Sequence, residues 1–314
     1  MVHPITVGLK TISASTKGFY VRDSGGAEHL VFDTNGQYGG NGIFADNGTS
    51  FYVDGNAGLD TNDGKSWASA VKTVAAGIAL ADDDIAVTNH WDRRNRLFIN
   101  GGWYTESLTR FPEKTDVIGV GNTDFLAKAK IIGVQVPAAA VMGCRFINIA
   151  FQNVTAANTV DIMASCHGIS FINCDFIGNA TTTAALEIND CADALIQGCR
   201  FYGLSTSSLK QLIGIQIKGT ATNTNLQILD NFICAAVGII IDDTDVVDGI
   251  IDGNILDVTT LAIDENADRL LVSNNQWVSA ANVASSFDLA TTRVVNNTAT
   301  GADKTMNVPV VATS

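Results

Sequence analysis

Proline is scarce in this sequence, with 4 residues in 314, and no apolar run is long enough to cross a bilayer. Basic residues are also few, because 19 lysines and arginines face 32 aspartates and glutamates, which gives a formal net charge of -13. A chain of that charge repels phosphate backbones and anionic lipid, so we expect neither a nucleic-acid partner nor membrane insertion. The opening segment MVHPITVGLKTISAS lacks the basic start and the continuous apolar stretch of a signal peptide, so none is predicted.

The six cysteines lack the spacing of a metal site. They include no CxxC pair, and no histidine is placed to complete a zinc site. The simplest interpretation is that they are small apolar core residues, with disulfides as the alternative. The 29 glycines and the many Asn, Asp and Thr residues favour short strands joined by tight turns over long helices.

One short pattern recurs seven times along the chain, as FINIAF, FINCDF, IQGCRF, ILDNFI, IDGNIL, VSNNQW and VVNNTA. Each copy opens with an apolar residue, from Phe146 to Val294, and most place a large apolar residue five positions later, as at Phe151. In a straight strand this odd spacing points the two side chains to opposite faces. Both can be buried only if the chain bends sharply between them.

The residue at the expected bend is Asn, Gly or Asp in all seven copies. These residues are Asn148, Asn173, Gly198, Asp230, Gly253, Asn274 and Asn296. They are the residue types that enter the left-handed backbone region at low cost, which a corner between two strands requires. We therefore expect one corner in each turn of a single-stranded parallel β-helix, an all-β solenoid in which every coil buries its apolar face against its neighbours.

The position after the corner is asparagine in the last four copies. Asn231, Asn254, Asn275 and Asn297 are expected to stack as a structural ladder inside the solenoid.

A second, looser strand precedes each corner from Asn173 onward, in segments such as ALEIN at 185–189 and GIIID at 238–242. Two outward columns of this second strand can be drawn from the sequence. One contains Asp161, Glu187, Gln216, Ile240, Ala262 and Asp288, and the other contains Met163, Asn189, Lys218, Asp242, Asp264 and Ala290.

The ends of the solenoid need covers, because each end exposes an apolar cross-section. Residues 66–84 form the best helical stretch, with Trp67, Val71, Val74, Ile78 and Ala81 able to make one apolar side, and we expect this helix to cap the first coil. The predicted organisation is an arm at 1–50, a cap loop and helix at 51–85, the β-helix at 86–299 and a tail at 300–314. The arm forms either an extra irregular coil or a docking arm that orders against a larger assembly.

The segments FYVDGNAGLDTNDGKSWASAVKTVAAGIA, LFINGGWYTESL, DVIGVG and KIIGV resemble the entry to the pectate-lyase-like superfamily of right-handed β-helices. This superfamily includes bacteriophage tailspikes and surface proteins as well as polysaccharide enzymes, and the resemblance covers residues 51–299. It implies a right-handed solenoid and, for a phage protein, a homotrimer. The calcium-binding Asp cluster and neighbouring Arg base of pectate lyases have no match in the sequence, so no catalytic residue is carried over.

Several outward carboxylates remain candidates for catalysis. Asp161 lies beside Glu187 in the first column, and Asp242 and Asp264 lie beside Lys218 in the second, which suits a paired-acid mechanism on a polysaccharide. The alternative is a solvated face with one ion pair. In the loop VDGNAGLDTNDG, the carboxylates of Asp54, Asp60 and Asp63 either bind calcium, the one cofactor considered, or form a run of Asx turns.

The sequence therefore favours a non-enzymatic surface protein of a phage virion, such as a head decoration, a fibre or a short spike, that contacts host-surface glycan. The missing catalytic motif and the regular solenoid support this hypothesis. The alternative is a polysaccharide hydrolase or lyase, either a depolymerising tailspike or a secreted enzyme. The expected location is the virion surface or the extracellular space, and on a virion we expect residues 1–50 to dock against other virion proteins.

Overall fold

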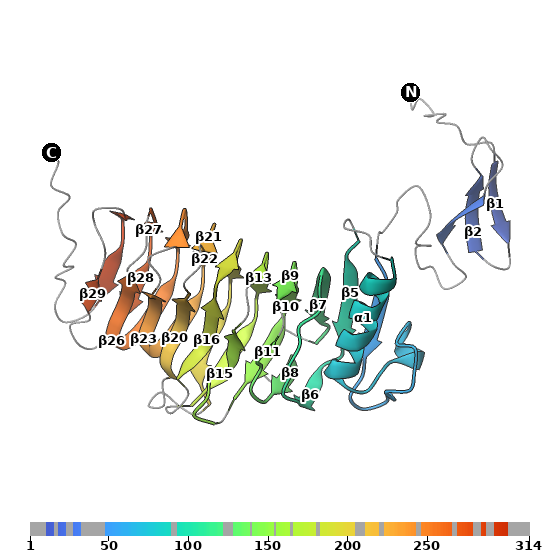
Figure 1. The fold of residues 1–314 in the computed structure, drawn as a ribbon, viewed down its shortest axis with the longest axis horizontal. Coiled ribbons are helices and arrows are strands. Elements are labelled where there is room, and N and C mark those ends of the chain that lie inside the picture. The colour runs from blue at the N-terminus through green and yellow to red at the C-terminus, as the bar shows by residue number, and fades with distance from the viewer. Residues whose placement is uncertain are drawn as a thin grey trace.

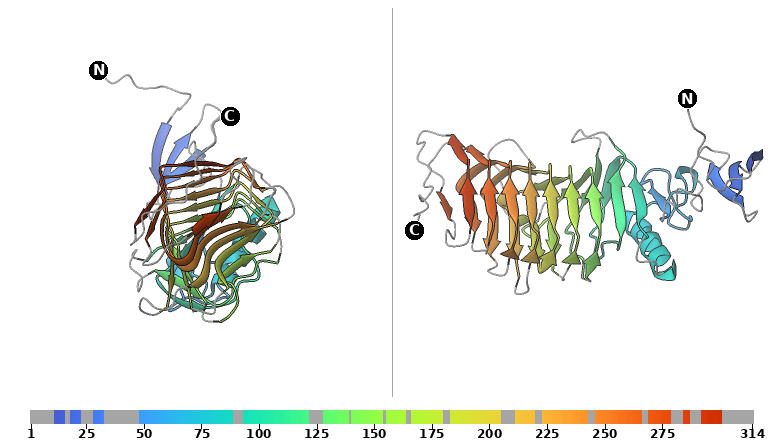
Figure 2. Two further views of the ribbon diagram at one scale, coloured as in Figure 1. Left: turned by 90° about the vertical axis from the view of Figure 1, so that its left-hand side faces the viewer. Right: turned by 90° about the horizontal axis from the view of Figure 1, so that it is seen from above.

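The computed structural model shows a long parallel β-helix with one helix at its N-terminal end, and a small antiparallel sheet earlier in the chain (Figure 1). It describes three strands within the first 32 residues. From residue 48 to residue 300 it describes the chain except for 89–92, 122–127, 139, 154, 164–165, 180–182, 205–210, 220–222, 243–245, 266–268, 279–283 and 287–291. Figure 2 shows the coils stacked side by side along one axis, so the fold is the right-handed β-helix predicted from the repeat.

One side of the solenoid is a ten-stranded parallel sheet. Its strands are β4 (Ser50–Val53), β5 (Asn95–Ile99), β7 (Thr115–Gly119), β10 (Arg145–Ile147), β14 (Ser170–Ile172), β18 (Leu195–Gln197), β22 (Gln227–Leu229), β25 (Ile250–Asp252), β27 (Leu271–Ser273) and β30 (Arg293–Val295). Each strand pairs in register with its copy in the next coil, so that Phe146 lies opposite Phe171 and Phe171 opposite Ile196. The sheet begins before the helix, which places the first coil inside the segment assigned to the cap.

The other side is a thirteen-stranded sheet. The branch next to the corners contains β6 (Gly102–Thr105), β8 (Ala129–Ile132), β11 (Ile149–Gln152), β15 (Asp175–Gly178), β19 (Arg200–Gly203), β28 (Gln276–Val278) and β31 (Thr298–Thr300). The second branch contains β12 (Val160–Ile162), β16 (Ala184–Asn189), β20 (Gln211–Lys218) and β29 (Ala284–Ser286). The long strands β23 (Phe232–Asp242) and β26 (Ile255–Glu265) belong to both branches.

Short strands close the third side of each coil. The strands β9 (Val141–Met142), β13 (Cys166–His167) and β17 (Cys191–Ala192) form one parallel sheet, and β21 (Asn223–Thr224) and β24 (Val246–Val247) form another. All described strand pairs of the solenoid are therefore parallel, as in a single chain that winds in one direction.

The seven predicted corners are all left-handed. Their φ angles range from 53° at Asn173 and Asn274 to 69° at Gly253. Because the backbone turns there, the apolar residues on both sides of each corner point inward, and Phe146, Phe151, Phe171, Phe176 and Phe201 are fully buried. Equivalent rings stack between coils, with centroids 5.4 Å apart for Phe146 and Phe171 and 4.6 Å apart for Phe176 and Phe201.

The four asparagines after the corners form one continuous hydrogen-bonded column. The side-chain amides of Asn231, Asn254 and Asn275 each donate to the side-chain oxygen of the next asparagine, at 2.9, 2.8 and 2.9 Å. In the preceding coils cysteine occupies the same position. The Cys199 thiol donates to the Phe171 carbonyl at 3.3 Å, much as the Asn231 amide donates to the Ile196 carbonyl at 3.0 Å.

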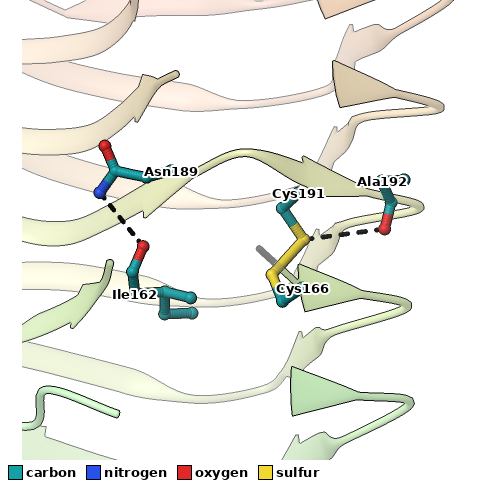
Figure 3. The surroundings of a disulfide bond; sticks show 5 residues. All are labelled: Ile162, Cys166, Asn189, Cys191 and Ala192. Carbon is teal, nitrogen blue, oxygen red and sulfur yellow. Dashed lines mark hydrogen bonds between the residues drawn. A yellow bond between two sulfur atoms is a disulfide. The ribbon is translucent and has the colours of Figure 1, made fainter. Parts of the chain in front are cut away.

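Two of the six cysteines are bridged. Cys166 in β13 and Cys191 in β17 are neighbours in adjacent coils, with Cα atoms 4.7 Å apart, and form a disulfide (Figure 3). The interpretation of all six as thiols is therefore wrong for this pair, because stacking brings together two side chains that are 25 residues apart in sequence. Cys144, Cys174 and Cys199 are free and buried, as expected of core residues.

The helix α1 spans Val74–Thr88 and covers the first coil. Val74, Ile78 and Ala81 are buried as predicted. The helix begins later than residue 66 because Val71 pairs with Val53 of β4 in a β-bridge. Trp67 lies in the short 3-10 helix η1 (Trp67–Ser69), where its ring contacts Tyr52 rather than the core.

The described strands of the N-terminal arm form an antiparallel sheet. They are β1 (Thr11–Ser15), β2 (Gly18–Arg22) and β3 (Glu28–Phe32), and the sheet contains these three strands alone. The docking role of residues 1–50 stays a prediction, and residues 301–314 of the predicted tail lie outside the described residues. Within the described part of the chain, no helix is long and apolar enough to cross a bilayer.

Candidate functional site

The strongest candidate site is a carboxylate pair on the outer face of the second branch of the thirteen-stranded sheet. Asp161 of β12 lies directly opposite Glu187 of β16, and Glu187 lies opposite Gln216 of β20. The neighbouring residues Val160, Ile162 and Ile188 are buried in the core, so the alternation of the strands turns both carboxylates outward. The predicted Asp161 and Glu187 neighbours are thus side by side in the structure.

One amide and one ammonium group hold this pair. The Asn158 amide donates to Asp161 Oδ2 at 3.2 Å and to Glu187 Oε2 at 3.1 Å. The Lys218 ammonium donates to the same Glu187 oxygen at 3.0 Å. Asn158 was missed by sequence reasoning, because it precedes the strand and belongs to no repeated position.

The surroundings of the pair raise the pKa of one of its two carboxyl groups. Burial, and next the negative charge of Glu187, raise the pKa of Asp161, while the Asn158 hydrogen bond and the Lys218 charge act in the opposite direction. Asp161 Oδ1 is buried and has no hydrogen-bond partner within the described residues. Glu187 is only 8% exposed and is paired with Lys218. A carboxyl group of raised pKa beside a second carboxylate is an arrangement that acid-base chemistry can use.

The second predicted column is partly wrong. Asp242 lies opposite Lys218, but Asp264 lies opposite Ile240, in the column of Asp161 and Glu187. The cause is a register shift between Ala235 and Val237 in the pairing of β23 with β26, which periodicity alone does not reveal.

Other members of the two columns also differ from prediction. The Lys218 ammonium contacts Glu187 rather than an acid of its own column. Ala262, placed on the outer face by the sequence, is fully buried, whereas Met163 is exposed. Asp288 and Ala290 lie outside the described residues.

The three carboxylates of the proposed calcium loop each accept backbone N–H groups. Asp54 Oδ1 accepts the Asn56 amide N–H at 2.9 Å, and Asp60 Oδ1 accepts the Lys72 and Thr73 N–H groups at 2.9 and 2.8 Å. Asp63 Oδ1 accepts a backbone N–H at 3.1 Å, and hydrogen bonds, first from the Ser69 side chain, lower its pKa. Among the described residues, no three acidic, cysteine or histidine side chains converge as metal ligands. Asp54 and Asp63 thus form Asx turns, whereas Asp60 binds the backbone just before α1.

A second ionic cluster was not foreseen from the sequence. Asp175 on the outer face of β15 is fully buried, and its carboxylate accepts two hydrogen bonds from Arg200 at 2.8 and 2.9 Å. The Lys128 ammonium lies 3.3 Å from Asp175 Oδ1. Burial and then the charge of Asp175 raise the pKa of Tyr202 well above its ordinary value. Side chains from three coils therefore meet at one carboxylate.

A cavity of about 310 Å³ opens beside the second half of α1. Asp82, Arg110, Phe111 and Glu113 contribute to its lining. The Asp82 carboxylate pairs with Arg110 and accepts the Glu113 N–H at 2.8 Å, and burial raises its pKa. The acid in this cavity therefore joins the helix to the loop at 110–114, which is a structural contact.

No model of a known protein family matches the sequence, and no curated protein matches it. Solved structures with a similar fold include the tailspike protein of E. coli bacteriophage HK620 in complex with a pentasaccharide. The match has 13% identity, covers 87% of this chain and 66% of the tailspike chain, and has a TM-score of 0.45. The tailspike protein gp49 of Acinetobacter baumannii bacteriophage Fri1, a capsular polysaccharide depolymerase, matches with 10% identity over 90% of this chain and 65% of its own, with a TM-score of 0.36. The chain thus spans less than two thirds of the length of these tailspikes.

Proposed function

We propose that this chain is a structural surface protein of a bacteriophage virion, a decoration, fibre or short spike, in which the β-helix is a rigid post that attaches to host-surface glycan. The observation that carries the proposal is the continuous asparagine column of hydrogen bonds inside the solenoid. Asn231, Asn254 and Asn275 each bind the next coil through both the backbone N–H and the side-chain amide. The coils that carry this column cannot separate without exposing buried polar groups.

This construction suits a mechanical role. The described coils from β4 to β30 pair continuously along the ten-stranded sheet, and the core beneath them is apolar along its length. Local opening of such a stack breaks ladders on both sides of the opened coil, which makes the backbone resistant to proteases. A particle surface exposed to a protease-rich medium requires this property.

The polar groups of the candidate sites also support a structural function. Glu187 is neutralised by Lys218, and the carboxylates of Asp54 and Asp60 are engaged by backbone N–H groups. The separate N-terminal sheet supplies a segment that can join the post to a particle without disturbing the coils. The sequence resemblance to the superfamily that contains phage tailspikes is consistent with this arrangement.

The test measures binding and cleavage together. Purified full-length protein is exposed to capsular and lipopolysaccharide glycans of candidate hosts, with binding followed by biolayer interferometry and cleavage by the release of reducing ends. We expect binding without new reducing ends, and immunogold labelling of the sides or tips of purified virions. Steady release of reducing ends would contradict the structural function.

The alternative is a polysaccharide hydrolase, and one observation favours it. Asp161 and Glu187 lie on adjacent coils with a shared amide donor, and burial and the Glu187 charge shift the pKa of Asp161 upward, the direction that suits a general acid. If cleavage is found, Asp161→Asn and Glu187→Gln should each abolish it. Asp242→Asn is the matched control, because Asp242 lies outside that column and should leave cleavage intact.

A further inference from the structure

The chain enters the ten-stranded sheet through a second column of left-handed corners, which the repeated pattern did not predict. In seven successive coils the residue three positions before the buried core residue of the strand has a φ between 45° and 66°. These residues are Lys114, Gly143, Gly168, Asp193, Asn225, Asp248 and Arg269. Five of the seven are Gly, Asn or Asp, which adopt this conformation at low cost, and two are basic.

Lys114 is the basic residue of this column that has no ion pair among the described residues. Arg269, the other basic residue, pairs with Asp248 at 3.1 Å. The φ of 45° costs a lysine about 1 kcal/mol relative to a glycine, because lysine has a Cβ and lacks the short polar side chain of asparagine. A residue held in such a conformation points to a function rather than to stability.

One carboxylate fixes two guanidinium groups beside this lysine. Asp116 Oδ1 accepts hydrogen bonds from Arg94 Nη1 at 2.8 Å and from Arg145 Nε at 2.6 Å, and its Oδ2 accepts one from Arg145 Nη2 at 2.6 Å. The Arg94 and Arg145 side chains are 38% and 39% exposed, whereas that of Asp116 is 10% exposed. Arg94 Nη2 and Arg145 Nη1 have no hydrogen-bond partner within the described part of the chain, so their N–H groups are available to a ligand.

Glycine leaves the approach to these cations open. A Cβ at Gly143 would lie 3.4 Å from Arg94 Nη2 and 3.9 Å from Lys114 Cγ, so both basic side chains border this glycine. The next corner, Gly168, also lacks a side chain, and a Cβ there would contact the backbone of Gly143 alone. Two successive corners therefore leave a gap in the layer of outward side chains. The three cations at this gap, Arg94, Lys114 and Arg145, are here named the basic corner.

The basic corner has an excess of positive charge. Its three cations share the single carboxylate of Asp116, which leaves two positive charges uncompensated in a chain whose net charge is -13. Glu113, the neighbour of Lys114 in sequence, lines the cavity beside α1 instead. A phosphate dianion matches this charge, and its oxygens accept hydrogen bonds from guanidinium and ammonium groups together.

From these contacts we infer that the basic corner binds a phosphate group. Arg94 and Arg145 donate through the N–H groups that Asp116 does not engage, and Lys114 contributes its ammonium. Inorganic phosphate and a phosphate carried by a sugar present the same chemistry to these cations. The inference is independent of the function proposed above, since it rests on the three cations, and a failure of the protein to bind host glycan leaves it standing.

The test is isothermal titration calorimetry of the full-length protein with sodium phosphate at about pH 8 and about 0.05 M salt. We expect saturable binding that weakens at about 1 M salt. Lys114→Gly should bind phosphate about tenfold more weakly, because one charged donor is lost, and should be at least as stable in urea, because glycine suits this φ. Arg269→Gly is the matched control, since it makes the same change of charge in the same column at the other end of the solenoid, and it should keep the wild-type affinity.

A second variant tests the gap itself. Gly143→Asp places a carboxylate beside Arg94 and Lys114, and it should abolish phosphate binding. The fold should tolerate this change, because Asp193 and Asp248 occupy the same position of other coils with a positive φ. An unchanged circular dichroism spectrum checks that the variant is folded.

Parallel titrations with glucose 6-phosphate and with glucose distinguish the two sources of phosphate. Binding of glucose 6-phosphate but not of glucose supports a sugar-borne phosphate, and binding of inorganic phosphate alone supports the free ion. Absence of saturable phosphate binding by the wild type overturns the inference. So does an equal loss of affinity in Lys114→Gly and Arg269→Gly, which would show that the anion responds to overall charge alone.

Discussion

Asn231 and Asn254, 23 residues apart in sequence, share one oxygen atom. Asn254 Oδ1 accepts the backbone N–H of Asn231 at 3.0 Å and its side-chain amide at 2.9 Å. The same Asn254 donates its own amide to the Ile228 carbonyl at 2.9 Å and to Asn275 Oδ1 at 2.8 Å. One side chain therefore satisfies groups of three successive coils in a space that water does not enter.

Replacement of this residue should be costly. Asn254→Ala leaves the Asn231 N–H and the Ile228 carbonyl without their partners, and we expect a loss of about 2 to 4 kcal/mol in the free energy of unfolding. Urea denaturation measures this loss. Asn189→Ala, which removes a single 3.1 Å hydrogen bond from a partly exposed side chain, should cost about 1 kcal/mol or less. Equal losses in the two variants would contradict the special role of the ladder.

The disulfide should stabilise the middle of the solenoid. Cys166 and Cys191 close a loop with a sequence separation of 25, for which the chain-entropy effect is about 3 kcal/mol. The double variant Cys166→Ser with Cys191→Ser should therefore melt at a lower temperature than the oxidised wild type. Reductant should lower the melting temperature of the wild type and of a Cys234→Ser control, but not that of the double variant.

At a corner position, an alanine variant should be less stable than a glycine variant. Asn173 has a φ of 53°, so Asn173→Ala places a Cβ-bearing side chain in the left-handed region without the local hydrogen bonding of asparagine. We expect a loss of about 1 kcal/mol relative to Asn173→Gly, as measured by chemical denaturation. If alanine and glycine are equivalent there, backbone strain does not determine the choice of residue.

The carboxylate pair should make stability depend on pH. The pKa of Asp161 is raised in the folded state, so the folded protein holds a proton that the unfolded chain releases at lower pH. The stability contributed by this proton is present below the ordinary pKa of aspartate and is lost as pH rises through the folded pKa. Asp161→Asn keeps a neutral side chain at every pH.

Above the folded pKa of Asp161, this variant should therefore be more stable than the wild type. Its free energy of unfolding should also depend less on pH. Urea titrations from about pH 3 to about pH 7 measure both effects. Asp242→Asn is the control, because it removes a carboxylate outside the column and should leave the slope unchanged. If the stability of Asp161→Asn depended on pH as steeply as that of the wild type, a group other than Asp161 would be responsible.

Local chemistry repeated in every coil allowed the sequence alone to determine the β-helix, the corners and the asparagine column. A residue that accepts a positive φ, such as Asn274, is recognisable wherever it stands, and a buried amide column needs a partner every coil. Because these preferences recur in seven copies of the repeat, they also predict how the seven coils align with one another. The capping helix was predicted on the same ground, from its own apolar spacing.

Tertiary structure decided the features that depend on contacts between coils. The register shift near Ala235 moved Asp264 into another column, the position of Asn158 joined Asp161 to Glu187, and stacking brought Cys166 to Cys191. None of these leaves a periodic signal, because each arises once, where two distant segments meet. A further example is the outward column of apolar side chains at Tyr52, Phe98, Ile118, Ile147 and Ile172, since a hydrophobic residue in a strand reads as core until the neighbouring strands show which face is filled.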